Sequence, residues 1–303
     1  MAHGPADESC EVHGAILPPS GRLCNSGSRD TIESTIPEGQ MDANSNYLLE
    51  NQYKDASKLN ARIALHVRFS VNPEPWWEWV FRLMKLPKET RLLEVGTGPA
   101  DFWRTNIGRI PDGWDVTLSD FSPGMLQQAQ ENLGDARERF TFSRINVQHI
   151  PFPDASFDGV IANFMLYHAP DLEQALREIQ RVLKPGGRLY AATNGSQHML
   201  QLNDLIRRLD PQAVIYTAAS VFGLENGVEA LHRHFPVVNR YVFDDALQVT
   251  DAEALLAYAF SMRRSQALAK NPDLLRNAIQ QEIDAQGAFF IQKHSGLFEA
   301  VKA

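Results

Sequence analysis

The chain has 303 residues, with 29 basic and 37 acidic side chains and a formal net charge of −8. A nucleic-acid surface needs basic residues to neutralise phosphates, so this balance disfavours an extended contact with DNA or RNA. We find no run of about 18 apolar residues and no basic stretch followed by an apolar one at the N-terminus, so neither a membrane span nor a secretion signal is expected. A cytoplasmic protein is the default expectation.

Residues 1–45 differ in composition from the rest of the chain. They are rich in Gly, Ser, Pro, Asp and Glu and show no sustained periodicity, which predicts a disordered tail. Both cysteines, Cys10 and Cys24, lie there and are too few for a disulfide framework or a four-thiolate metal site. We expect no metal. Met41 is an alternative to Met1 as the natural start, and the sequence leaves both open.

Residues 46–86 carry apolar side chains at helical spacing and predict a helical cap. Prolines at 73 and 75 precede an apolar stretch that contains Trp76, Trp77 and Trp79. Prolines at a helix start followed by an apolar face are typical of an amphipathic helix. Tyr53, Lys54 and Arg62 in this region are candidates for closing over a bound carboxylate, or they form a solvated helix face.

Strands and helices alternate from residue 91 onward. The predicted strands are 91–95, 115–120, 139–145, 157–163 and 188–194, and the predicted helices are 101–109, one that begins at Pro123 with Ser122 as its N-cap, and 171–183, which KPGG at 184–187 ends. This alternation predicts a parallel sheet with right-handed crossovers. The ligand crevice of such a sheet lies at the carboxyl ends of the strands.

Residues 196–303 are more helical. Residues 198–235 predict a helical insertion, or lid, after the fifth strand, and 237–243 and 287–301 read as strands that can extend the sheet, the latter broken by a turn near His294. We expect one domain over residues 46–303.

Polar side chains fall at or just past the ends of four predicted strands, namely Glu94, Asp120, Asn146 and Asn163. Because the carboxyl ends of parallel strands meet at one edge, these side chains are expected to lie together. Four polar residues at equivalent positions are hard to explain by packing alone.

The glycine-rich turn after the first strand selects among cofactors. Gly96 and Gly98 begin a G-x-G pattern, but Asp101 stands where a dinucleotide site has its third glycine, and its carboxylate would repel a pyrophosphate. The lysine of a Walker-type loop is also absent. A nucleoside without phosphates, S-adenosylmethionine, fits better. Glu94 can orient its ammonium directly or through neighbouring groups, and Asp120, 26 residues on, can accept both ribose hydroxyls.

LLEVGTGPA (92–100), VTLSDFSPGMLQQAQENL (116–133) and the segment 145–193 with PFPDASFD and LKPGG, in this order, closely resemble class I S-adenosylmethionine-dependent methyltransferases of the small-molecule group. The resemblance covers residues 90–195 and, more weakly, 46–89 and 237–301. It implies a Rossmann-like, doubly wound α/β fold. Its sheet would be mostly parallel and seven-stranded with helices on both faces.

The resemblance also implies roles for single residues. Glu94, Gly96, Thr97 and Gly98 match the first motif, Asp120 the ribose-binding acid with Phe121 beside the adenine, Asn146 and Val147 the adenine-contacting pair, and Asn163 the fourth-strand position that opens onto the methyl donor. Two positions depart from the family pattern. Ala100 replaces the third glycine of the motif, and Asn146 stands where an acid is common.

The expected activity is transfer of a methyl group from S-adenosylmethionine, with S-adenosylhomocysteine as product, to an O, N or C atom of a small organic acceptor. Positioning can supply much of the rate in such an in-line displacement. His168 is a candidate base for a hydroxyl acceptor, or it packs over the cofactor. Two alternatives stay open, an RNA or protein methyltransferase and a non-catalytic S-adenosylmethionine-binding protein. No nucleic acid or membrane partner is expected, and the oligomeric state is left open.

Overall fold

The computed structural model describes residues 57–215, 219–262 and 266–303. The predicted tail with its two cysteines and alternative start, and the candidates Tyr53 and Lys54, lie outside these residues. A seven-stranded sheet forms the body, in the order β3-β2-β1-β4-β5-β9-β6. Its strands are β1 (Thr90–Val95), β2 (Trp114–Asp120), β3 (Phe140–Arg144), β4 (Phe157–Asn163), β5 (Leu183–Asn194), β6 (Val237–Phe243) and β9 (Ser295–Val301).

All pairings from β3 to β5 are parallel, and β9 is antiparallel to both of its neighbours, β5 and β6. The direction in which successive strands are added to the sheet reverses after β3. Strands β2 and β3 lie on one side of β1, and β4 and β5 lie on its other side. Ligands of open α/β sheets bind at such a switch point, beyond the carboxyl ends of the strands. The prediction of a Rossmann-like, mostly parallel seven-stranded sheet is confirmed.

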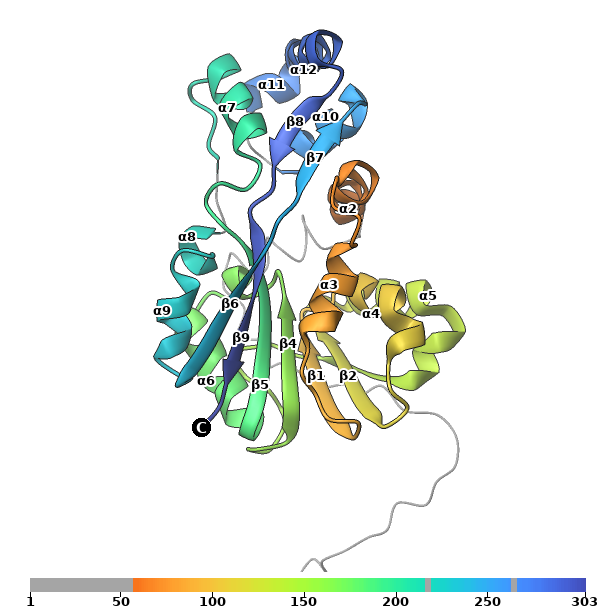
Figure 1. The fold of residues 1–303 in the computed structure, drawn as a ribbon, viewed down its shortest axis with the longest axis vertical. Coiled ribbons are helices and arrows are strands. Elements are labelled where there is room, and N and C mark those ends of the chain that lie inside the picture. The colour runs from red at the N-terminus through yellow and green to blue at the C-terminus, as the bar shows by residue number, and fades with distance from the viewer. Residues whose placement is uncertain (1–56, 216–218, 263–265) are drawn as a thin grey trace, which may run out of the picture.

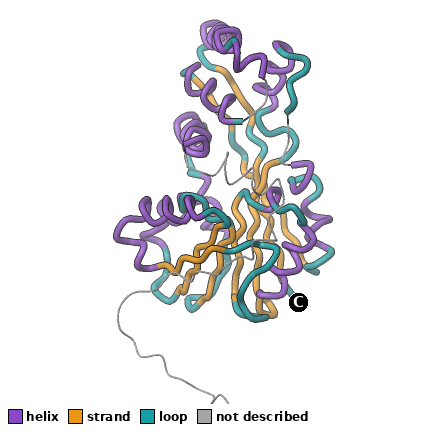
Figure 2. The backbone as a smooth tube through the Cα atoms, turned by 180° about the vertical axis from the view of Figure 1, so that it is seen from behind, coloured by secondary structure: helices purple, strands orange, loops and turns teal. Residues whose placement is uncertain are grey.

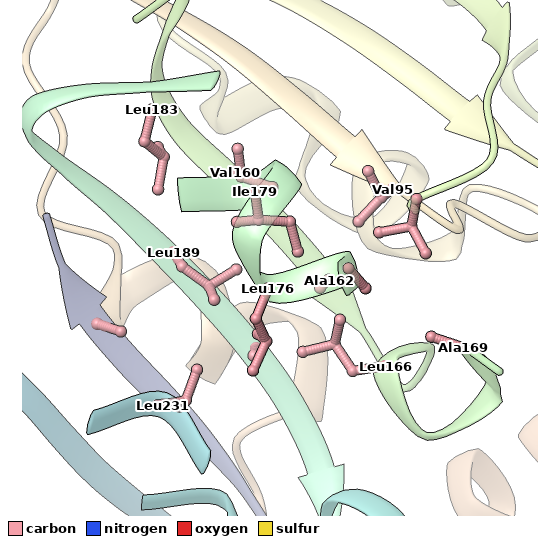
Figure 3. Packing of buried hydrophobic residues seen from close by; sticks show 14 of the residues in the cluster. Val95, Val160, Ala162, Leu166, Ala169, Leu176, Ile179, Leu183, Leu189 and Leu231 are labelled. Carbon is pink, nitrogen blue, oxygen red and sulfur yellow. The ribbon is translucent and has the colours of Figure 1, made fainter. Parts of the chain in front are cut away.

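One face of the sheet is covered by α6 (Leu172–Val182), α8 (Ala219–Phe222) and α9 (Gly227–His232). Leu176 and Ile179 of α6 pack on Val160 of β4 and Leu189 of β5 (Figure 3). These helix positions recur at helical spacing, and Asp171 caps the helix by accepting the Gln174 N–H at 2.9 Å.

The opposite face carries α3 (Trp76–Leu83), α4 (Asp101–Asn106) and α5 (Pro123–Leu133). Successive residues of β1 point to opposite faces, so Leu92 joins this second core while Leu93 joins the first. Ser122 accepts the Met125 N–H and Pro123 is the first residue of α5, as the sequence predicts. Helices therefore flank the sheet on both sides (Figure 2).

A second lobe stands above the carboxyl edge of the sheet (Figure 1). It contains α2 (Ser57–Phe69), α7 (Leu200–Leu209), β7 (Ala246–Val249), α10 (Ala252–Ser261), α11 (Gln266–Lys270), α12 (Pro272–Gln286) and β8 (Phe289–Gln292). Strands β7 and β8 pair with each other in a separate two-stranded sheet, and the lobe has its own apolar core. Helix α2 joins the lobe before β1, and α7 joins it after β5. After β6 the chain enters the lobe again at β7 and returns through β8 into β9.

Three details differ from the sequence expectations. Strand β5 begins at Leu183, so KPGG lies within the strand at a register shift and does not form a helix cap. Residues 287–301 contribute to two sheets, since β8 pairs with β7 and only β9 extends the large sheet. Within 198–235, α7 lies in the upper lobe while α8 and α9 pack on the sheet face. None of the described helices is long and apolar enough to cross a membrane.

Candidate functional site

The loop after β1 has an unusual backbone. Gly96 and Gly98 adopt φ values of 69° and 55°, and Ala100 adopts 61°, so three residues lie in the left-handed region within five positions. Glycine does this without steric cost, whereas Ala100 carries a Cβ there. The replacement of a motif glycine at 100 thus leaves the turn in place but strained. The turn leads directly into α4.

Two side chains from elsewhere in the chain close over this loop. A Cβ at Gly96 would lie 2.7 Å from the Cβ of Met165, so Met165 packs directly on the glycine backbone. A Cβ at Gly98 would lie 3.7 Å from Leu59 on α2. The N-terminal helix of the upper lobe therefore reaches the glycine loop.

Glu94 lies at the end of β1 and is 1% exposed. Its Oε2 accepts hydrogen bonds from the Thr97 hydroxyl at 2.7 Å and the Trp103 indole N–H at 2.5 Å, and its Oε1 accepts the Asn163 amide at 2.9 Å. Burial raises the pKa of Glu94 to about 7, although these hydrogen bonds work in the other direction. The carboxylate is thus enclosed by three protein donors.

Asn163, at the end of β4, links Glu94 to the carboxyl edge of the sheet. Its amide nitrogen donates to Glu94, which orients the amide, and its Oδ1 is a buried acceptor with no hydrogen-bond partner. Buried polar atoms are normally satisfied, so this oxygen is suited to receive a donor from a ligand. An ammonium group of a ligand that donates to this oxygen would be linked to the Glu94 carboxylate through the Asn163 amide.

Asp120, at the end of β2, faces the same loop. Its two carboxylate oxygens accept the Gly98 N–H and the Ser122 N–H, each at 2.9 Å. Each oxygen keeps a further lone pair, which two vicinal hydroxyls can use. Burial raises the pKa of Asp120 to about 6 against the effect of the backbone N–H groups. Beside it, Phe121 lies under the Arg144 guanidinium, 5.5 Å from the ring centroid.

Asn146 and Val147 follow β3. The Asn146 Oδ1 already accepts the Gln148 N–H at 3.0 Å, so the oxygen expected to address an adenine amino group also holds a local turn. Val147 is buried and belongs to the core under α6. Both residues lie at the same sheet edge as Asp120, since β3 pairs with β2 in parallel.

His168 lies in a short 3-10 turn, Leu166–His168, after β4. Its ring contacts Tyr167 at a centroid distance of 4.6 Å. Burial, with a smaller contribution from the positive charge of Arg62, lowers the pKa of His168 to about 4. The imidazole is therefore neutral at physiological pH, and Arg62 of α2 is near enough to act on it.

Reasoning from the sequence missed two residues at this site. Trp103 supplies the shortest of the three donors to Glu94 and is fully buried, and Met165 covers Gly96. A tryptophan two residues into the helix that follows a glycine turn is the signal that could have identified the first. Met165 offers no such signal, since only the fold brings it to the loop.

Part of the sequence is similar to known proteins. Residues 93–191 match a protein family described as a methyltransferase domain. The demethylmenaquinone methyltransferase of Listeria welshimeri is 39% identical over 115 residues, which cover 38% of this chain and 49% of that protein. A ubiquinone/menaquinone biosynthesis C-methyltransferase of Hahella chejuensis is 38% identical over 100 residues, covering 32% of this chain and 40% of that protein. The chain thus spans about half the length or less of these curated relatives.

Solved structures agree on the fold. A methyltransferase-like protein of Bacillus halodurans superposes with a TM-score of 0.54 at 16% identity, covering 75% of this chain and 98% of that chain. Phosphoethanolamine N-methyltransferase 2 of Haemonchus contortus, solved with S-adenosyl-L-methionine, has a TM-score of 0.54 at 19% identity, with 87% of this chain and 60% of that chain covered.

Proposed function

We propose that this chain, which contains a class I S-adenosylmethionine-dependent methyltransferase domain, binds S-adenosylmethionine and transfers its methyl group to a small organic acceptor. The observation that carries the proposal is the Glu94–Asn163 pair. It places a buried acceptor oxygen without a protein partner beside the glycine loop, where the ammonium of the methionine moiety would bind.

Other residues of the site would contact the remaining parts of the cofactor. Asp120 would accept the ribose hydroxyls, with Phe121 beside the adenine and Asn146 and Val147 at its edge. Gly96 and Gly98 supply the positive φ values of the loop. Gly98 leaves its backbone open to the cofactor, because a Cβ there would meet only Leu59, at 3.7 Å. When bound, S-adenosylmethionine supplies a methyl carbon already activated by its sulfonium.

The protein contributes chiefly by binding and orientation. A bound and aligned acceptor gains the effective molarity of an intramolecular reaction, about 10⁵–10⁸ M for well-oriented pairs. For a hydroxyl acceptor we propose that the neutral His168 accepts a hydrogen bond from the hydroxyl and so orients it; because its pKa is about 4, the proton passes on to solvent as the methyl group is transferred. For an N or C acceptor it has only a packing role.

A small-molecule acceptor is supported by the relatives, which are named for demethylmenaquinone and for ubiquinone or menaquinone biosynthesis. The net charge of −8 also disfavours a nucleic-acid substrate. We therefore place the acceptor among small organic compounds of the quinone-precursor kind.

Calorimetric titration with S-adenosylhomocysteine, with NAD⁺ titrated in parallel, tests the cofactor. We expect binding of the nucleoside alone. Asp120→Ala should weaken it by about 1.5–3 kcal/mol, the range for hydrogen bonds to charged groups, while Asp115→Ala on the same strand should not change it. Tight NAD⁺ binding, or unchanged affinity in Asp120→Ala, would contradict the proposal. Methyl-labelled cofactor then separates acceptors, since label in RNA or protein would exclude a small molecule.

A further inference from the structure

The two edges of the seven-stranded sheet differ in length and in exposure. One edge is β3, and none of its five residues is exposed. The other edge is β6, which has seven residues, of which only Phe243 is buried (Figure 1). Within the part of the chain that the structure describes, no strand pairs with the outer side of β6. An unpaired strand edge presents backbone N–H and C=O groups with which a further strand can pair.

Strand β6 lacks the features that usually keep an edge strand from pairing. Its sequence, VVNRYVF, contains no proline, no lysine and no acid. Every residue of the strand has one partner residue on β9, so no bulge interrupts it. Its single charge is that of Arg240, whose guanidinium donates to the Leu224 carbonyl of the same chain at 3.0 Å. The strand is therefore regular and rich in residues that favour strand pairing.

Exposed apolar side chains lie on both faces of β6. Val238 packs against the core beneath α6, and Val242, four residues later, points to the same side of the strand. Val237 shares the opposite side with Phe243, which belongs to the core beneath α3. Val242 is 53% exposed and Val237 is 49% exposed. Single exposed valines are ordinary, but two of them on an unpaired edge indicate a protein partner.

The order of side chains along β6 favours a second copy of the same chain as that partner. When two identical strands pair antiparallel about a two-fold axis, residues equally far before and after the axis lie opposite each other. With the axis at Arg240, Val238 lies opposite Val242 of the second copy, and Val237 lies opposite its Phe243. An axis one residue earlier or later would instead place Arg240 opposite Val238 or Val242. Only the first arrangement gives both exposed valines an apolar neighbour.

We propose that two copies of this chain associate through their β6 strands, paired antiparallel about Arg240, so that the two sheets join into one. This inference goes beyond the proposed methyl transfer and does not depend on it. The two-fold axis reverses the strand direction, so the two upper lobes and the two glycine loops lie toward opposite ends of the dimer. The two Arg240 charges oppose the pairing, although the bond to Leu224 holds each on its own copy. We therefore expect a dimer that dissociates on dilution.

Sedimentation velocity of the full chain over about a hundredfold range of concentration tests for this dimer. We expect a monomer–dimer equilibrium. Val242→Lys should raise the dissociation constant at least about tenfold, because it removes two apolar contacts and places a cation near Arg240 of the second copy. Val214→Lys replaces a valine that is 74% exposed and lies outside the sheet, and should change the constant by less than about twofold.

Interchain disulfides test the register. In a chain that also carries Cys10→Ser and Cys24→Ser, Arg240→Cys should form a disulfide-linked dimer under mild oxidation. Directly opposite residues of an antiparallel pair have Cα atoms about 4.5–5.5 Å apart, which a disulfide can span. Val237→Cys should form none, because the axis at Arg240 separates the two copies of residue 237 by about 20 Å. A reducing agent should return the linked dimer to single chains.

Three results would each overturn the inference. These are a monomer at every concentration, a dimer that Val242→Lys leaves unchanged, and equal crosslinking through Val237→Cys and Arg240→Cys. Thermal melting by circular dichroism shows whether each variant folds, so that loss of the dimer is not mistaken for unfolding. If Val242→Lys does not fold, the two crosslinking variants decide the question by themselves.

Discussion

Asn163 donates its side-chain amide to Glu94 across 2.9 Å, although the two residues are 69 positions apart in the chain. The contact exists because β1 and β4 are neighbours in the sheet, so their ends meet at one edge. It fixes which atom of the amide is free, since the nitrogen is used and the oxygen is not. A buried charge thereby orients a neutral acceptor toward the glycine loop.

Asn163→Ala tests whether the Asn163 side chain links a ligand to Glu94. It removes the free acceptor and one of the three donors to Glu94, so we expect S-adenosylhomocysteine affinity to fall by about 1.5–3 kcal/mol. Calorimetry provides the measurement, with Asn239→Ala on the edge strand β6 as the matched control. An affinity within error of wild type would mean that Asn163 only braces Glu94.

The affinity for S-adenosylhomocysteine should depend on pH. The pKa of Glu94 is raised to about 7, and a ligand ammonium nearby favours the ionised carboxylate, so binding requires loss of the proton at low pH. At pH 6 about one tenth of Glu94 is ionised, and affinity should be about tenfold weaker than at pH 8. Titration in two buffers of different ionisation enthalpy should show proton release near pH 6. Glu94→Gln should remove the larger part of this dependence and leave the smaller part that Asp120 contributes with its pKa of about 6. A flat profile in wild type would count against the prediction.

Glycine substitutions separate backbone strain from steric contact. Gly108→Ala has open space and an ordinary φ, so stability should stay within about 0.5 kcal/mol. Gly134→Ala also meets nothing, but its φ of 54° should cost about 1–2 kcal/mol. Gly96→Ala combines a φ of 69° with the Met165 Cβ at 2.7 Å, and should cost about 1–3 kcal/mol more than the strain alone. Urea unfolding should rank the three in this order; equal losses at 96 and 134 would exclude the Met165 contact.

The buried Lys293–Asp245 pair should be strongly coupled. Lys293→Met leaves the Asp245 charge buried without its cation, which should cost about 3–5 kcal/mol of unfolding free energy. The double variant Lys293→Met with Asp245→Asn should lose less than the sum of the single losses. The exposed pair Arg82–Glu74 is the control, because Arg82→Ala should cost no more than about 1 kcal/mol. Additive losses at 245 and 293 would show that the two charges do not interact.

Much of the fold could be predicted because its signals are local. The strand over 157–163 follows from a short apolar run with turn residues before it, and α5 from the Ser122–Pro123 start. The polar strand ends, Glu94 and Asp120 among them, could be grouped because parallel strands share an edge. The hydrogen bonds that these side chains form could not be predicted, because they depend on distances between atoms and the sequence pattern does not give those distances.

The upper lobe was beyond such reasoning for a physical reason. Strand β8 and strand β9 are almost continuous in sequence, and only their pairing partners, β7 and β5, assign them to different sheets. Likewise Trp76 reads as an ordinary apolar helix residue, and its unpartnered N–H becomes visible only when Phe164 and Phe243 lie against the ring. Contacts distant in sequence are what the amino-acid pattern leaves undetermined.

The position of β9 has a consequence for how the chain assembles during synthesis. Strand β6 forms its sheet hydrogen bonds with β9, which the ribosome adds only after residues 244–294, the part of the upper lobe that follows β6, have been made. While these residues fold, the edges of β5 and β6 that later pair with β9 therefore remain unpaired. If the lobe folds slowly or misfolds, β5 and β6 stay without their partner β9. A substitution that destabilises the lobe would therefore be expected to promote aggregation through these unpaired strand edges.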